Sequence, residues 1–173
     1  MFSKILVKLI DQAVIPAILL IAVRIISVIV VAKYFSLDFA ISGGGFVLNK
    51  TQDYVLLNSY STLIMLMTLA VGILFILIKS YVFHDSHISP QLTAKVFSLK
   101  LSTFIQDSFD LYSQGSIWLS YLYLLMFVTA LMAVFGLIQI WVFFVALILT
   151  VLSTIFLIFD IENELDLEAN NRE

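Results

Sequence analysis

An arginine inside an apolar stretch is the residue of this sequence with the clearest potential for chemistry. Arg24 lies near the centre of the apolar residues 14–34. A charged side chain at the centre of a membrane-spanning helix costs about 2.5–3.5 kcal/mol on insertion scales, so Arg24 is expected to face protein, water or an anion. Ala13, Ala17 and Ser27 share its helix face, and such small residues let another helix approach closely. The candidate roles of Arg24 are anion binding and contact with a partner helix. The alternative is that the membrane only tolerates this arginine, through snorkelling of the side chain and deformation of the bilayer.

Hydroxyl groups are the polar partners that the sequence offers to this arginine at a similar depth. No carboxylate lies within the apolar stretches to neutralise the guanidinium. We therefore predict an intramembrane polar cluster of these residues: Arg24, Ser27, Thr68, Thr129, Thr150 and Ser153. The alternative is that each hydroxyl donates to a carbonyl of its own helix, as Ser and Thr commonly do in membrane helices.

The polar turn at residues 84–87 is the second candidate for chemistry. His84, Asp85 and His87 carry donor atoms that suit zinc or iron. A metal site usually needs at least three protein ligands with fixed second-shell partners, and a single turn rarely supplies them. Asp107, Asp110 or acids of the C-terminal tail would have to complete the set. The turn is thus at most a weak metal site, and a role in starting the following helix is favoured.

Catalytic motifs are otherwise absent from the sequence. The chain has no cysteine, which excludes disulfides, thiolate metal sites and a cysteine nucleophile. It also has no Gly-rich phosphate loop, no nucleophile elbow and no zinc-protease helix motif. We predict that the protein is not an enzyme and that it holds no cofactor.

The composition places these residues in a membrane protein. Hydrophobic residues make up 62% of the 173 residues, charged residues only 12%, and the mean hydropathy is +1.10. A soluble domain of this length needs far more polar surface. The lipid bilayer is therefore the main partner. A broad basic patch is missing, which excludes nucleic acid as a partner.

Four apolar stretches are long enough to cross a hydrocarbon core of about 30 Å. We predict an all-α integral membrane protein whose membrane domain covers residues 1–159, with spans at residues 14–34, 59–79, 117–136 and 139–159. Pro16 would then lie in the first turn of span one, where proline costs little. Residues 35–57 form a loop that could hold a short hairpin, and residues 136–139 form the turn between spans three and four.

The segment between the two pairs of spans is amphipathic. Apolar residues recur at helical spacing over residues 89–113, with serines and Gln106 on the opposite side. Ser89 and Pro90 are a typical helix start, and Gln114-Gly115-Ser116 interrupts the pattern. We predict an interfacial helix that joins two helical hairpins. Residues 160–173 form an acidic tail, expected to be solvated and partly disordered or to lie against lysines of the central segment.

The distribution of basic residues predicts the orientation of the chain. Six lie on the side of the termini and the central segment, and two lie on the other side: Lys4, Lys8, Lys79, Lys95, Lys100 and Arg172 against Lys33 and Lys50. By the positive-inside rule, both termini and the interfacial helix are cytoplasmic. A bacterial inner membrane is the expected location.

The expected function follows from missing catalytic groups and available interaction surfaces. We predict a non-catalytic subunit or scaffold of a membrane assembly, with other membrane subunits or copies of itself as partners. The alternative is an oligomeric channel or transporter with Arg24 near an anion path.

Overall fold

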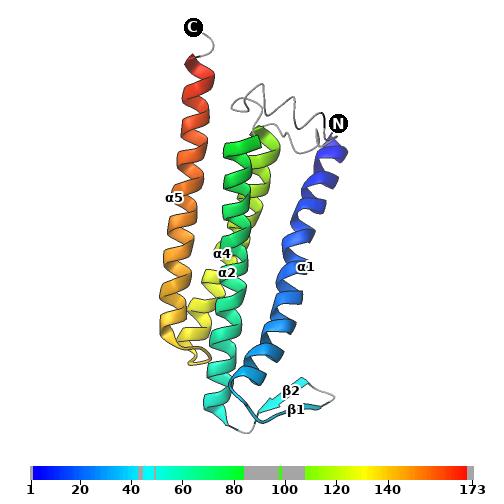
Figure 1. The fold of residues 1–173 in the computed structure, drawn as a ribbon, viewed down its shortest axis with the longest axis vertical. Helices are drawn as coiled ribbons and strands as arrows, with labels where there is room; N and C mark the ends of the chain where they lie inside the picture. Colours follow the sequence, from blue (N-terminus) through cyan, green and yellow to red (C-terminus); the bar gives the residue numbers. More distant parts are fainter. Residues whose placement is uncertain (1, 43–44, 49, 84–97, 99–107, 171–173) are drawn as a thin grey trace.

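The structure is a bundle of long helices with one small hairpin at its end (Figure 1). This computed structural model describes residues 2–42, 45–48, 50–83, 98 and 108–170. The elements are α1 (Phe2–Tyr34), β1 (Phe39–Ser42), β2 (Gly45–Leu48), α2 (Thr51–Phe83), α4 (Ser108–Val134) and α5 (Ile140–Asn170). Each helix contains a stretch that is long and apolar enough to cross a membrane: Gln12–Tyr34, Thr51–Tyr81, Leu111–Val134 and Ile140–Glu162. The prediction of a multi-pass helical membrane protein is confirmed.

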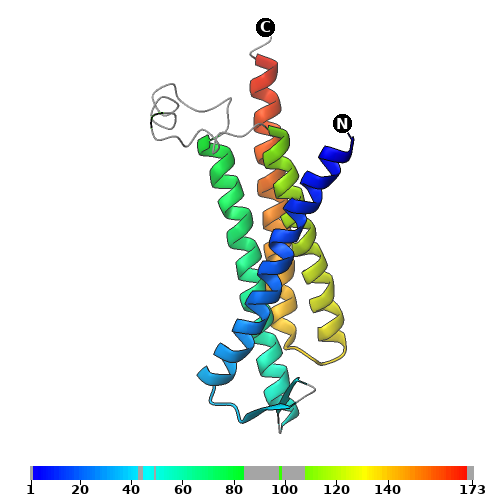
Figure 2. The same cartoon turned by 90° about the vertical axis from the view of Figure 1, so that its right-hand side faces the viewer.

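Helix α2 is the centre of the bundle. It packs against α1, α4 and α5, whereas α1 packs against α2 and α4. Helix α1 is inclined to the other three helices (Figure 2). Both chain ends lie at the end of the bundle where α2 finishes and α4 starts; the β-hairpin and the α4–α5 turn lie at the opposite end (Figure 1). We refer to these as the terminal end and the hairpin end.

Two apolar clusters hold the helices together. The larger cluster joins α2, α4 and α5 through residues such as Leu69, Leu122 and Val142, which are fully buried. The smaller cluster lies at the hairpin end, where Val31 and Leu57 pack with Leu48 of β2. Most outward-facing residues of the helices are also apolar, as expected for surfaces that face lipid.

Helix α1 begins much earlier than span one was predicted to begin. It runs without a break from Phe2, so Pro16 lies inside the helix and not in its first turn. An interior proline lacks a donor N–H, and its ring opens the helix one turn upstream. At that level the Tyr121 hydroxyl of α4 donates to the Ala13 carbonyl over 3.1 Å. A neighbouring helix thus satisfies a backbone group near the proline, which is how membrane helices tolerate this residue.

Helix α2 also begins earlier than predicted, at Thr51. The loop before it contains the antiparallel hairpin β1–β2, with Phe39 opposite Leu48 and Ser42 opposite Gly45. A short hairpin, which the sequence of residues 35–57 allowed, is therefore present. The start of α2 is polar, and Asp53 lies in its first turn, where a negative charge favours the helix dipole. Hydropathy alone placed the start of span two too late because it omitted this polar turn.

Helix α4 continues through residues 114–116, where the sequence predicted a break. It begins at Ser108, so residues 108–113 belong to α4, and Gln114-Gly115-Ser116 is helical. A Cβ at Gly115 would lie 3.0 Å from a methyl carbon of Leu157 on α5. The glycine therefore allows α4 and α5 to approach each other closely, and it does not end a helix. Of the rest of the predicted interfacial helix, only Ser98 is described, and it is helical and exposed.

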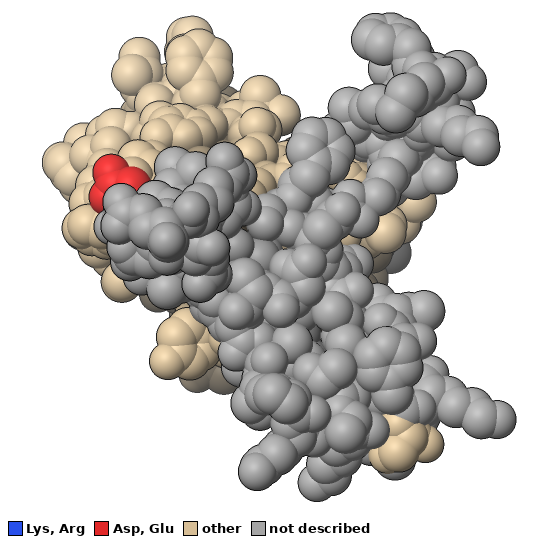
Figure 3. Space-filling view, turned by 90° about the horizontal axis from the view of Figure 1, so that it is seen from above, with Lys and Arg blue, Asp and Glu red and all other residues tan. Residues whose placement is uncertain are grey.

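The turn between α4 and α5 lies where it was predicted. Gly136 adopts a positive φ of 68° there. The acidic tail differs from expectation, because α5 continues as a helix to Asn170. Asp160, the first acid of that tail, accepts a hydrogen bond of 2.8 Å from Ser80 of α2. This bond ties α2 to α5 near the terminal end. The described atoms visible from that end belong almost entirely to uncharged residues, apart from a small acidic patch (Figure 3).

Candidate functional site

Arg24 of α1 binds three polar side chains of α2. Its Nη1 donates to the Ser61 hydroxyl and, over 3.5 Å, to the Thr62 hydroxyl. Its Nη2 donates to Asn58 Oδ1 over 2.7 Å. We call Arg24, Asn58, Ser61 and Thr62 the Arg24 cluster. Within the described residues all three acceptors are neutral, so the hydrogen bonds fix the guanidinium without cancelling its charge.

The three acceptors form one stripe on α2. Asn58, Ser61 and Thr62 are spaced three and four residues apart, so they lie on one face of the helix. The Ser61 hydroxyl donates to the Leu57 carbonyl over 2.6 Å. This leaves its lone pairs for the arginine. Ser27 of α1 similarly donates over 3.0 Å to the Arg24 carbonyl and is buried in the α1–α2 contact.

The lengths of the helices decide which residues meet Arg24. Arg24 lies ten residues before Tyr34, and Ser61 lies ten residues after Thr51, so the antiparallel helices bring the two side by side. Had α2 begun near Ser59, as predicted, the same count would reach the neighbourhood of Thr68. The predicted partner and the actual one differ because the start of α2 was misplaced.

Asn58 connects the cluster to the turn between α4 and α5. Its Nδ2 donates to the Leu137 carbonyl over 3.4 Å. One residue further along α2, the Ser59 hydroxyl accepts a 2.8 Å hydrogen bond from the Gln139 backbone N–H. Arg24 therefore lies close to the level of this turn and not midway along the bundle. Its charge is nearer to one end than the sequence suggested.

Aromatic rings surround the same level of the bundle. Tyr60 of α2 lies 5.9 Å from Trp141 of α5 and 4.9 Å from Phe35, between ring centroids. Tyrosine and tryptophan concentrate at membrane–water interfaces. This ring cluster is typical of the headgroup region, where an arginine side chain reaches polar surroundings at much lower cost than at the bilayer centre.

The hydroxyls predicted to surround Arg24 bond elsewhere. Thr68 donates to the Ile64 carbonyl, Thr129 to the Met126 carbonyl and Thr150 to the Ala146 carbonyl, at 2.7–2.8 Å. Ser153 is buried on α5, a helix that does not form a main contact with α1. Of the six predicted residues, the structure brings together only Arg24 and its own neighbour Ser27. The threonines follow the alternative in which each hydroxyl bonds to its own helix.

The residues that the sequence analysis missed are Asn58, Ser61 and Thr62. Their helical stripe of three polar side chains in an apolar region was the available signal. Asn58 lies just outside the predicted span two, and Ser61 and Thr62 lie near its start, so none of them has the predicted depth of Arg24. Their actual depth differs because neighbouring helices extend to different levels.

The predicted metal ligands His84, Asp85 and His87 lie outside the described residues. Among the residues that are described, no group of three histidine, cysteine or acidic side chains could hold a metal ion. Comparisons of the chain with protein-family models, with curated protein sequences and with solved structures find no match. The functional interpretation therefore rests on the Arg24 cluster.

Proposed function

We propose that this protein is a non-catalytic subunit or scaffold of a membrane assembly, in which Arg24 receives an acidic group of a partner. The proposal rests on one observation. Arg24 is held in a fixed orientation by Asn58, Ser61 and Thr62, yet in the described part of the chain these acceptors are neutral. The side chain is also partly exposed. A cation held in this way attracts a negative charge from outside the chain.

The geometry suits a carboxylate or another planar anion. A guanidinium has five N–H donors in a fixed fork that matches a carboxylate. The hydrogen bonds of Arg24 to its three described acceptors come from its two terminal nitrogens, Nη1 and Nη2. The Nε–H takes no part in these bonds. Hydrogen bonds from a guanidinium are charge-assisted, and a carboxylate can accept two of them in parallel, which adds both energy and geometric specificity. A partner carboxylate would thus gain more from Arg24 than the neutral acceptors do.

The proposal includes the arrangement of the chain in the membrane. Two helical hairpins are joined by an amphipathic interfacial helix, and both termini lie in the cytoplasm of a cell with an inner membrane. Lys33 and Lys50 would then face the opposite side with the β-hairpin. The alternative function, an oligomeric channel or transporter with Arg24 near an anion path, uses the same uncompensated charge, so the experiment must separate the two.

The test supplies a counter-charge from within the chain. Asn58 Oδ1 already lies 2.7 Å from Arg24 Nη2, so Asn58→Asp places a carboxylate beside the guanidinium. We expect the bundle to keep most of its thermal stability in detergent, because the ion pair with Arg24 offsets the loss of the 3.4 Å hydrogen bond from Asn58 Nδ2 to the Leu137 carbonyl, while the contact with an external acidic group is lost. Ser36→Asp adds the same charge at an exposed position two residues after the end of α1 and serves as the control. Arg24→Leu should also abolish the contact, and Arg24→Lys should restore it only in part.

The measurement combines native mass spectrometry with anion flux. The proposal predicts that a subunit at fixed stoichiometry copurifies with wild type and with Ser36→Asp, but not with Asn58→Asp or Arg24→Leu. A flux of chloride through reconstituted wild-type vesicles that is lost in the same two variants would favour the channel. Identical assembly and flux in all the variants would show that Arg24 is merely tolerated, which contradicts both functions.

A further inference from the structure

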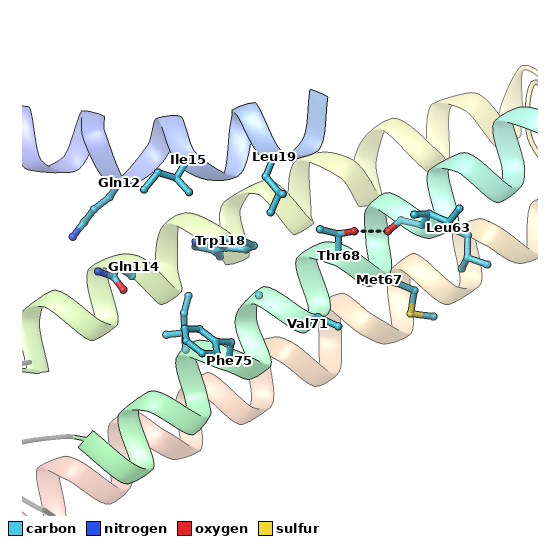
Figure 4. A pocket seen from close by; sticks show the side chains of 13 residues that line it. Gln12, Ile15, Leu19, Leu63, Met67, Thr68, Val71, Phe75, Gln114 and Trp118 are labelled. Carbon is cyan, nitrogen blue, oxygen red and sulfur yellow. Dashed lines mark hydrogen bonds between the residues drawn. The ribbon is translucent and has the colours of Figure 1, made fainter. Parts of the chain in front are cut away.

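A crevice lies between α1, α2 and α4, and the Arg24 cluster does not explain it. Its volume is about 750 Å³, and its walls come from all three helices. Helix α1 leans away from its neighbours toward the terminal end (Figure 1). The residues of α1 that line the crevice lie between Gln12 and Leu19 (Figure 4). We propose that this crevice binds one phospholipid, with acyl chain inside the crevice and headgroup at its polar end.

The walls of the crevice change from polar to apolar along its length, as a phospholipid changes from its headgroup to its acyl chains. Gln12 and Gln114 lie together at one end, and Ile15, Leu19 and Val71 follow along the apolar part (Figure 4). Both glutamines lie near the ends of their membrane-length stretches, which start at Gln12 and Leu111. Their amide groups can bond to the ester or phosphate oxygens of a headgroup, while the rest of the wall offers almost no polar atoms.

Among the described residues that line the apolar wall, Thr68 carries the hydroxyl, and this hydroxyl is already hydrogen-bonded. Thr68 donates to the Ile64 carbonyl over 2.8 Å, as the dashed line in Figure 4 indicates. At the polar end, Gln12 Oε1 accepts a 3.0 Å hydrogen bond from Ser113. This bond fixes the amide and leaves its N–H donors for a ligand. The polar groups of the crevice thus point to a headgroup at one end and a hydrocarbon chain beyond it.

The length of the crevice matches one leaflet of a bilayer. Its wall on α2 extends from Leu63 to Ile76. At 1.5 Å per residue this is roughly 20 Å, against roughly 15 Å for half of a 30 Å hydrocarbon core. An acyl chain that starts at the headgroup level of Gln12 would therefore remain inside the crevice for most of its length.

The crevice has a volume of about 750 Å³, and its apolar walls favour a hydrocarbon chain as its content. Water is no alternative, because walls this apolar do not provide the polar partners that a buried water needs. An empty crevice would forfeit the dispersion contacts of its walls.

The back wall is rigid enough to hold a defined shape. The indole ring of Trp118 lies directly against Gly72, so close that a Cβ on that residue would overlap three ring atoms. Both residues line the crevice. Helices α2 and α4 are therefore locked together behind it, and α1 is the wall that can adjust to a ligand.

The first experiment maps lipid contacts on the unmodified protein. The protein is reconstituted in phosphatidylcholine vesicles that contain a small fraction of phosphatidylcholine with a photoactivatable group in its acyl chain. After irradiation, adducts are located by mass spectrometry. Ile15 and Ile18 are almost equally exposed, at 64% and 62%, but only Ile15 lines the crevice. We expect several-fold more adducts on crevice residues such as Ile15 than on Ile18.

The second experiment fills the crevice. Ile15→Phe combined with Val71→Phe narrows it and should lower the crevice adducts several-fold. Ile18→Phe combined with Leu74→Phe enlarges exposed positions outside the crevice and should leave them unchanged. Adduct yields that follow exposure alone, protection of the crevice from all labelling, or equal effects of the two pairs would overturn the proposal. The map of the unmodified protein decides the question even if a filled variant does not fold.

Discussion

Arg24 carries a full charge that is oriented by neutral oxygen atoms. Three acceptors on one face of α2 hold it, and a net hydrogen bond to a charged group contributes about 1.5–3 kcal/mol. Together these bonds offset the cost of a central arginine in a membrane helix, about 2.5–3.5 kcal/mol. The position near the α4–α5 turn lowers this cost further. The arginine can therefore remain stable in the isolated chain while its charge stays available to a partner.

Gly72 is a second residue whose role depends on a single neighbour. Gly72→Ala would drive a methyl group into the ring of Trp118, and overpacking of this kind typically costs about 1–3 kcal/mol. We expect a lower melting temperature in detergent. Gly115→Ala is the matched control, because its neighbour is the flexible end of Leu157; it should change the stability little.

The same substitution in a Trp118→Leu background checks the cause. With the ring removed, Gly72→Ala should no longer destabilise, and the better helix propensity of alanine is worth up to about 1 kcal/mol. If Gly72→Ala costs the same stability in both backgrounds, the contact with Trp118 is not the reason for the glycine.

At the scale of the elements, two helices end in the same way. Leu37 N–H donates to the Ala32 carbonyl after α1, and Leu137 N–H donates to the Met132 carbonyl after α4, over 2.9 and 2.8 Å. These bonds define Schellman motifs, in which one residue adopts a left-handed conformation. Gly136 fills that position after α4, but Ser36 fills it after α1 with a φ of 52°. The two turns therefore differ in backbone strain.

This difference predicts opposite effects of two substitutions. Gly136→Ala forces a side chain into the left-handed region, which costs about 1–2 kcal/mol, although nothing lies within 4 Å of the added Cβ. Ser36→Gly removes a similar strain, and after the entropy cost of glycine it should stabilise by roughly 0.5–1 kcal/mol. Thermal unfolding in detergent measures both. Destabilisation by both substitutions would show that contacts of the serine outweigh its backbone strain.

At the scale of the whole molecule, the helices reach different levels at the hairpin end. The turn between α4 and α5 meets α2 at Asn58 and Ser59, whereas α2 itself begins at Thr51. The start of α2, the end of α1 and the β-hairpin thus extend beyond the α4–α5 turn. This uneven end keeps Arg24 close to polar surroundings.

The arrangement of the bundle predicts a labelling pattern in oriented membranes. Val47 and Glu162 are exposed at opposite ends of the bundle, and the chain has no cysteine of its own. Glu162→Cys should react with a membrane-impermeant reagent from the cytoplasmic side, and Val47→Cys from the other side. Ser98→Cys should behave like Glu162→Cys. Reaction of Val47→Cys and Glu162→Cys from the same side would contradict the proposed topology.

The sequence by itself determined the number of membrane-length helices and the turn at Gly136. These features depend on local properties: the length of an apolar stretch, its polar interruptions, and the backbone that glycine allows. The limits of each helix were less predictable. Proline and glycine are residue types that often end helices. Contacts from Tyr121 and Leu157 on other helices nevertheless make Pro16 and Gly115 compatible with helix interiors.

Only the tertiary structure decided which groups surround Arg24. That choice depends on the relative sliding of α1 against α2, and this is fixed by where each helix ends and by the hairpin between them. A shift of two turns in the start of α2 exchanges Ser61 for the region of Thr68. Local sequence patterns do not predict this shift, because it arises from packing between segments that are far apart in the chain.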